Sequence, residues 1–175
     1  MTILLCTSLR PSPRTRTFCN DLVASSSDFK YFARGKSGLA YLAAYAKSEG
    51  GNRLWIVNSR YGGPKLIECY DTSDHIPRQI SSLLIHHVQL RREMKDFCQA
   101  DTRQRRLRLV QPDSISIDRL YKTVKDSLGC LPEDAVKSTE LHIIKSNDYC
   151  AELFFVDNET KLPSGPAIYL WDYRC

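Results

Sequence analysis

Residues 7–18 read TSLRPSPRTRTF, and this stretch lies between two apolar segments. The short apolar run before it, residues 2–7, is typical of a buried strand. Ser12 and Pro13 suit the first positions of a helix, and apolar residues recur at helical spacing from Phe18 onward. The stretch therefore predicts a strand, a loop and a helix in succession.

The start of this helix carries three arginines, Arg10, Arg14 and Arg16. Cations are unfavourable there, because the backbone dipole places partial positive charge at a helix N-terminus, at a cost of roughly 0.3–1 kcal/mol. A bound anion would reverse the sign, since backbone N–H groups, dipole and guanidinium groups would all attract it. The arginines therefore indicate an anion site, and phosphate is the natural anion.

The rest of the chain alternates strands and helices and then becomes rich in strands. We expect one helix that has Ser37 as its N-cap and ends at Gly50, and another helix over residues 117–128. The expected strands are 29–32, 53–58, 65–71, 80–90, 107–110, 140–146, 151–158 and 167–173, the last two pairing as a hairpin. This order predicts an α/β or α+β fold with a mixed sheet.

If the first three strands run parallel, the loops that follow them lie at one edge of the sheet, where ligands of open α/β sheets bind. Tyr31 and Tyr61 lie near these loops and are candidates for stacking on unpaired bases. A solvated basic face without a ligand fits the same pattern equally well. The seven cations that would converge on this edge are Arg10, Arg14, Arg16, Arg34, Lys36, Arg60 and Lys65.

Charge is unevenly distributed along the 175 residues, although the net charge of +5 is moderate. Residues 1–71 hold ten Lys/Arg against five Asp/Glu, and residues 72–110 hold eight against four. Residues 111–175 hold seven against eleven. This asymmetry favours a polyanionic partner for the front of the molecule. The hydrophobic fraction of 42% is ordinary for a folded soluble protein.

Side chains for catalysis or metal binding form no recognisable motif. None of the seven cysteines belongs to a CxxC pair or to a spacing typical of a zinc site, so we expect reduced thiols in an intracellular protein. We expect Cys19 to be packed in the core. Cys6, Cys69 and Cys150 fall in expected strands. The turn RYGGPK lacks the Walker spacing, and no GxGxxG occurs. His86 and His87 lie in an expected strand, which would turn them to opposite sides. These missing motifs lead us to expect no cofactor and no metal. No apolar run reaches membrane-spanning length, so we expect no membrane partner.

Three segments together resemble the Brix-domain family of ribosome-assembly factors: TSLRPSPRTRTFCNDL, FARGKSGLAYL and LWIVNSRYGGPKLIECYD. The first signature of the family consists of Thr-Ser, two basic residues, Pro-Ser and then Arg-Thr-Arg. The second signature is an Arg-Gly-Lys before a helix. The third is an Arg-x-Gly-x-Pro turn between strands. This chain departs from it at Leu9, where the family has a basic residue, and carries Pro13 at the free position. The matching residues are Thr7, Ser8, Pro11, Ser12, Phe18, Arg34, Gly35, Lys36, Arg60, Gly62 and Pro64.

The resemblance implies one Brix-like domain over residues 1–175, with two similar halves at about 1–75 and 76–175. Each half would resemble the anticodon-binding domain of class II aminoacyl-tRNA synthetases. It also implies binding to immature ribosomal RNA without catalysis, with other assembly factors or ribosomal proteins as further partners. The length is similar to that of a stand-alone archaeal-type member for the small subunit, which implies the cytoplasm in a prokaryote and the nucleolus in a eukaryote.

Two other functions use the same residues. One is an enzyme that binds a small-molecule phosphate or nucleotide at the same loops; the other is a protein-interaction module whose basic face meets an acidic partner, with Ser12 as a phosphorylation site. The arginine-rich segment with Arg103, Arg105, Arg106 and Arg108 either extends the RNA surface or is a solvated loop.

Overall fold

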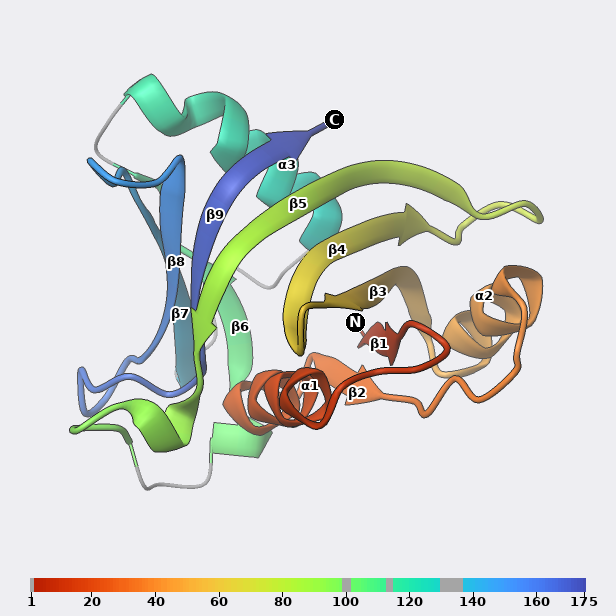
Figure 1. Ribbon diagram of the computed structural model, residues 1–175, viewed down its shortest axis with the longest axis horizontal. Coiled ribbons are helices and arrows are strands. Elements are labelled where there is room, and N and C mark those ends of the chain that lie inside the picture. The colour runs from red at the N-terminus through yellow and green to blue at the C-terminus, as the bar shows by residue number, and fades with distance from the viewer. Residues whose placement is uncertain (1, 99–101, 113–114, 130–136) are drawn as a thin grey trace.

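A computed structural model describes residues 2–98, 102–112, 115–129 and 137–175 (Figure 1). Its centre is a curled nine-stranded mixed sheet with the order β2-β1-β3-β4-β5-β9-β8-β7-β6. The helices are α1 (Pro13–Ser25), α2 (Leu39–Ser48) and α3 (Asp118–Leu128). The strands are β1 (Thr2–Thr7), β2 (Phe29–Tyr31), β3 (Gly51–Arg60), β4 (Gly63–Asp71), β5 (Arg78–Gln89), β6 (Arg106–Leu109), β7 (Ser138–Ile144), β8 (Ala151–Asp157) and β9 (Ala167–Arg174).

β1 is buried on both of its faces, which explains why its sequence is continuously apolar instead of alternating. Ile3 and Leu5 belong to the larger core, with residues of α1 and α3. Leu4 and Cys6 belong to a smaller core with residues of α2. The helices α1 and α2 therefore cover opposite faces of the sheet at β1 and β3.

The expected N-cap of α1 is confirmed, whereas the expected N-cap of α2 is wrong. Ser12 accepts a hydrogen bond from the backbone N–H of Thr15 at 3.2 Å, and Pro13 is the first helical residue. Ser37 was expected to cap α2, but the N-cap is Gly38. The reason is a turn in which the N–H of Ser37 donates to the carbonyl of Arg34. A smaller error concerns Cys150, which comes just before β8 and not within a strand.

The pairing pattern of the sheet repeats from its two ends toward the middle. β1 is parallel to β3, and β3-β4-β5 continue antiparallel. Likewise β6 is parallel to β7, and β7-β8-β9 continue antiparallel. β5 and β9 join the two series as an antiparallel pair, and β2 extends one end. The expected hairpin of β8 and β9 and the mixed sheet are thus confirmed.

The curl of the sheet brings the residues before β2 into contact with β6. The buried carboxylate of Asp28 accepts a hydrogen bond from the backbone N–H of Leu107 at 2.7 Å. The N–H of Ser27 donates to the carbonyl of Arg105 at 2.8 Å. We call these contacts between residues 25–28 and residues 102–107 the seam.

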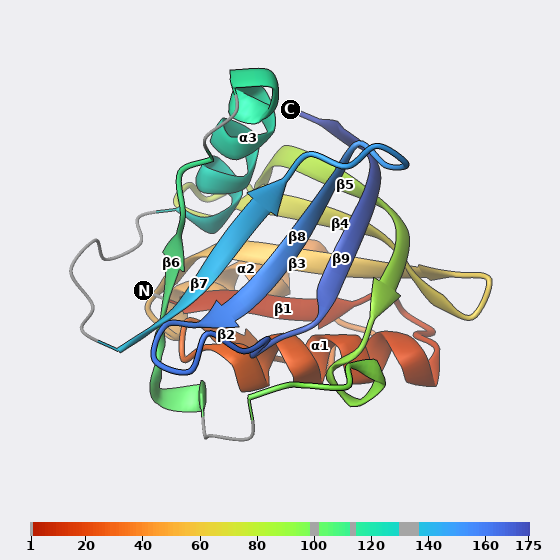
Figure 2. The same ribbon diagram turned by 90° about the vertical axis from the view of Figure 1, so that its left-hand side faces the viewer.

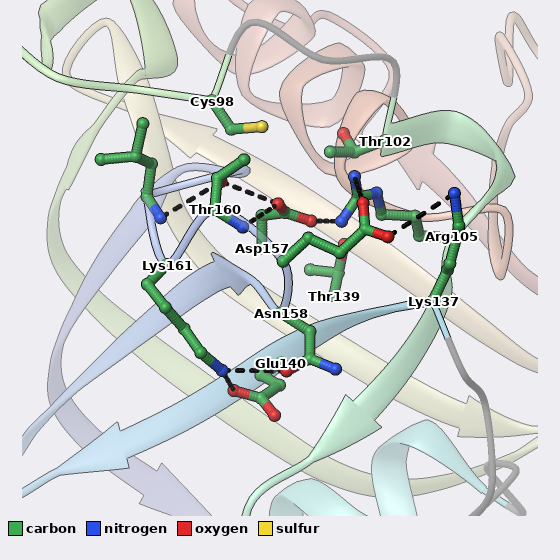
Figure 3. Close-up of polar contacts among 12 residues, drawn as sticks. Cys98, Thr102, Arg105, Lys137, Thr139, Glu140, Asp157, Asn158, Thr160 and Lys161 are labelled. Carbon is green, nitrogen blue, oxygen red and sulfur yellow. Dashed lines mark hydrogen bonds and ion pairs between the residues drawn. The ribbon is translucent and has the colours of Figure 1, made fainter.

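The arginine-rich segment forms part of this seam and is not a solvated loop. Arg105 is buried, forms an ion pair with Asp157 and donates to Glu159 at 2.8 Å (Figure 3). Arg106 pairs with Asp28 at 2.9 Å, and Arg108 lies 3.8 Å from Glu140. These three arginines therefore add little free positive charge for RNA. The side chain of Arg103 lies outside the described residues.

Candidate nucleic-acid interface

The three loops expected to carry a ligand lie at one edge of the sheet, because β1 runs parallel to both β2 and β3. The first loop is fixed to the end of β3: the N–H of Ser8 donates to the carbonyl of Val57 at 3.0 Å. The N–H of Ser12 donates to the hydroxyl oxygen of Ser59 at 3.2 Å. The second loop follows β2, and the third is the turn between β3 and β4. We call this edge, with the seven predicted cations, the basic edge.

Within the described residues, the side chains of four of these cations form no ion pair or hydrogen bond. Three of the four, Arg10, Arg16 and Lys36, are exposed. Arg60 is also exposed, and its guanidinium carbon lies 4.9 Å from the ring centre of Tyr61. At least one of the four lies in or directly beside each of the three loops, so a ligand that spans the edge meets positive charge along its length.

The other three cations bind within the chain. Arg14 donates to both carboxylate oxygens of Glu93 and, at 2.8 Å, to the carbonyl of Val88. This pair holds the pKa of the Glu93 carboxyl below its usual range, chiefly through the hydrogen bond from Arg14. Arg34 donates to the carbonyl of Ser37 at 3.0 Å, and Lys65 to the carbonyl of His86. These side chains position neighbouring segments as well as contributing charge.

The helix N-termini at this edge differ in their free N–H groups. At α1 the side chain of Ser12 already occupies the N–H of Thr15, so only part of the expected anion site remains. At α2 the N-cap Gly38 provides no side-chain hydrogen bond, and exposed Lys36 is nearby in the sequence. The N-terminus of α2 is therefore the more open of the two to an anion.

The two candidate stacking residues have different surroundings. Tyr61 is 85% exposed at the tip of the β3–β4 hairpin, with its backbone in the left-handed region at φ 53°. Tyr31 is half-buried and packs against the larger core. Tyr61 is therefore available to a base, whereas Tyr31 serves mainly in packing.

His86 and His87 were expected on opposite sides of a strand, and this expectation was wrong. The β5–β9 register shifts between Ile85 and His87, as in a β-bulge. Both rings then lie together, with their Nδ1 atoms 2.9 Å apart. Burial is the main cause that lowers the pKa of His87, and the nearby charges of His86 and Lys65 lower it further. Tyr149, Tyr169 and Trp171 surround the pair, a cluster that the local sequence pattern did not predict.

Known proteins similar to this chain are ribosomal biogenesis proteins. No protein-family model matches it. A probable Brix domain-containing ribosomal biogenesis protein of Aeropyrum pernix is 37% identical over 90 residues, which are 51% of this chain and 50% of that protein. One of Methanopyrus kandleri is 33% identical over 88 residues, 50% of this chain and 46% of that protein. In these matches the chain spans about half the length of the curated relatives.

Solved structures match nearly the whole chain. The crystal structure of a probable ribosomal biogenesis protein from Aeropyrum pernix has a TM-score of 0.82 at 26% identity, over 98% of this chain and 96% of that one. The resemblance to the Brix-domain family is confirmed. An archaeal Imp4-like protein shares the fold, with a TM-score of 0.66 at 20% identity over 98% of this chain and 99% of that one. The structural match thus includes the strand-rich second half, where the sequence signatures are weakest.

The thiols of this chain suit packing better than chemistry. The six cysteines among the described residues are free. Burial raises the pKa of Cys6, Cys19 and Cys69 to about 12, so these thiols stay protonated, and the packed Cys19 is confirmed. The described residues include no group of three His, Cys, Asp or Glu side chains placed to hold a metal. Across the same residues, no helix combines the length and apolarity needed to cross a membrane.

Proposed function

We propose that this chain is a non-enzymatic RNA-binding factor in ribosome biogenesis. It binds immature ribosomal RNA at the basic edge and assists its folding or processing. The observation that carries the proposal is the set of exposed cations at and beside three separate loops at one sheet edge, in a chain similar to ribosomal biogenesis proteins. A phosphate backbone presents anions in a row, which suits cations spaced along an edge.

The organisation of the chain is part of the same proposal. We infer one Brix-like domain with halves at about 1–75 and 76–175, each similar to the anticodon-binding domain of class II aminoacyl-tRNA synthetases. The repeated pairing pattern of the sheet supports two similar halves, although it groups β5 with β1, β3 and β4 and so favours a boundary after Gln89. The acidic last part of the chain, residues 111–175, would contact other assembly factors or ribosomal proteins. Such a factor works in the cytoplasm of a prokaryote or the nucleolus of a eukaryote.

The test is the salt dependence of binding to single-stranded ribosomal RNA fragments, followed by fluorescence anisotropy. Log affinity should fall with log salt at about −0.7 per neutralised phosphate. The double variant Arg16→Ala/Arg60→Ala should bind more weakly, and its slope should be shallower by roughly 1.4. The matched control is Lys122→Ala/Lys125→Ala, which removes two exposed cations from α3, outside the basic edge, and should keep the slope.

Three outcomes would contradict the proposal. Equal slopes for the folded Arg16/Arg60 variant and the control would remove the basic edge from the RNA site. Saturable binding of a nucleotide without RNA binding, with a salt dependence that corresponds to only one or two charges, would favour a small-molecule enzyme. Binding only to an acidic protein would favour an interaction module.

A further inference from the structure

The second half of the sheet has an outer face that no described helix covers. Figure 2 shows β7, β8 and β9 toward the viewer with no helix in front of them. At β1 and β3 the corresponding face packs against α2 in the smaller core. Large apolar side chains are exposed on the open face: Leu84 by 39%, Ile144 by 51% and Trp171 by 60%. Neighbouring exposed apolar side chains of this kind commonly mark a binding surface.

Two bulges explain why aromatic rings gather on this face. In the β5–β9 ladder, Leu84 faces Asp172 and Ile85 faces Leu170, so Trp171 is an extra residue. His87 then faces Tyr169, which leaves His86 as the extra residue of β5. An extra residue disrupts the alternation of side chains, and both bulged side chains end on the same face.

The rings form a connected layer. His86 stacks on Trp171 with ring centres 5.4 Å apart and an interplanar angle of 23°. His87 stacks on Tyr169 at 4.0 Å and 10°. The ring of Tyr149 lies 4.9 Å from His86 and 5.4 Å from His87. We call these five residues the aromatic platform. Because neighbouring rings pack against each other, the platform is ordered in the absence of a ligand. This order reduces the entropic cost of binding.

The platform adjoins the basic edge. β5 runs in the same direction as β3, since each is antiparallel to β4, so His86 and His87 lie toward the same sheet edge as Arg60. Lys65 donates to the carbonyl of His86, and Arg14 donates to the carbonyl of Val88. Two cations of the basic edge therefore flank the histidine pair directly, and one RNA strand can continue from the edge onto the platform.

The charges around the platform suit bases better than phosphates. Burial, more than the nearby charges of His86 and Lys65, lowers the pKa of His87 and favours a neutral imidazole, whose face can stack. Glu152 lies opposite Tyr169 in the β8–β9 ladder and Asp172 follows Trp171. Their carboxylates repel phosphate and can accept hydrogen bonds from base N–H groups.

We propose that the aromatic platform stacks unpaired bases of the same RNA whose phosphates the basic edge holds. The inference rests on the proposed RNA-binding function and adds a second, base-contacting site to it. Trp171 supplies the most exposed ring. Stacking on such rings tolerates any base, so the platform selects single-stranded RNA over duplex without reading a sequence.

Tryptophan fluorescence tests this directly, because the chain has two tryptophans and only one is accessible. Trp55 is 1% exposed and Trp171 is 60% exposed. The probes are a single-stranded oligouridylate of about ten nucleotides and an abasic chain of equal length. The oligouridylate should quench Trp171 saturably, and the abasic chain should not. In Trp171→Phe the quenching should disappear, while affinity measured by anisotropy stays within about threefold, since phenylalanine still stacks.

The affinity measurement uses Trp171→Ala, which should weaken oligouridylate binding by about 5- to 100-fold. Its control is Ile76→Ala, which removes an apolar side chain that is 80% exposed between β4 and β5, outside the basic edge and the platform, and should leave the affinity unchanged. Thermal melting confirms that each variant is folded.

The outcomes separate this inference from the proposed function. If RNA binds and Arg16→Ala/Arg60→Ala weakens it, but Trp171→Ala binds normally and Trp171 fluorescence is constant, the platform proposal is wrong and the proposed function stands. If RNA does not bind the wild-type chain at all, both are wrong. If an arginine-rich peptide quenches Trp171 and RNA does not, the platform is a protein-binding surface, which overturns the proposal.

Discussion

At the scale of single residues, the partner of a side chain decides its role. Arg14 and Arg16 lie two positions apart in α1, yet Arg14 binds Glu93 and Val88 whereas Arg16 is exposed and unpaired within the described part of the chain. Glu93 lies 79 residues away in the sequence. The arginine pattern around Ser12 therefore predicted a basic helix start, but not which of its cations is free.

Replacing Glu93 tests this division through pH. Because the folded-state pKa of Glu93 lies below its ordinary value of 4.5, its pair with Arg14 contributes stability at neutral pH that is lost as pH falls through the folded-state pKa. Glu93→Gln should therefore lower the free energy of unfolding at neutral pH by about 0.5–1 kcal/mol, as for a partly exposed ion pair. Urea denaturation should show the difference shrinking under acidic conditions; a difference independent of pH would contradict this assignment.

At the scale of elements, the β3–β4 hairpin combines a conformational cost with an exposed ring. Its two turn residues, Tyr61 and Gly62, have φ values of 53° and 80°, the left-handed pattern of a type I′ turn. Glycine and asparagine suit this turn, whereas tyrosine carries a steric cost. The sequence RYGGPK predicted the turn correctly, and the backbone conformation shows that Tyr61 occupies a position that disfavours tyrosine.

Tyr61→Asn should separate stability from binding. Asparagine tolerates the left-handed region better, so the free energy of unfolding should rise by about 0.5–1 kcal/mol. RNA affinity should fall by about fivefold or more if Tyr61 stacks on a base. Urea denaturation and anisotropy measure the two effects. The control is Ile76→Asn, at another residue that is 80% exposed, which should leave affinity unchanged; equal affinity of the Tyr61 variant and wild type would exclude a stacking role.

At the scale of the whole molecule, the seam closes the curled sheet. Residues of the loop before β2 bond to the start of β6, although these segments lie at opposite ends of the strand order. Asp28 is central, because its buried carboxylate satisfies the N–H of Leu107 and pairs with Arg106. The larger core, which includes Phe29, Trp55 and Phe155, lies inside this closed arrangement.

Asp28→Ala should therefore destabilise the whole fold. It leaves the buried N–H of Leu107 without its acceptor and Arg106 without its partner, which should lower the free energy of unfolding by about 2–4 kcal/mol. Asp96→Ala, at an exposed aspartate outside the seam, should change it by less than about 0.5 kcal/mol. Chemical denaturation compares the two variants. Similar small losses in both would show that the seam contributes little.

Local sequence was sufficient for the features that depend on local physics. Apolar periodicity and the Ser12-Pro13 cap predicted the strands and α1, and the parallel order of the first strands predicted the basic edge. Local sequence did not predict which cations have exposed side chains, such as Arg16 and Arg60. It also did not predict the ion pair of Arg105 or the ring cluster around His86. They depend on ladder register and on contacts between segments more than fifty residues apart. A bulge of one residue reverses which face a side chain occupies, and only the folded sheet determines where it occurs.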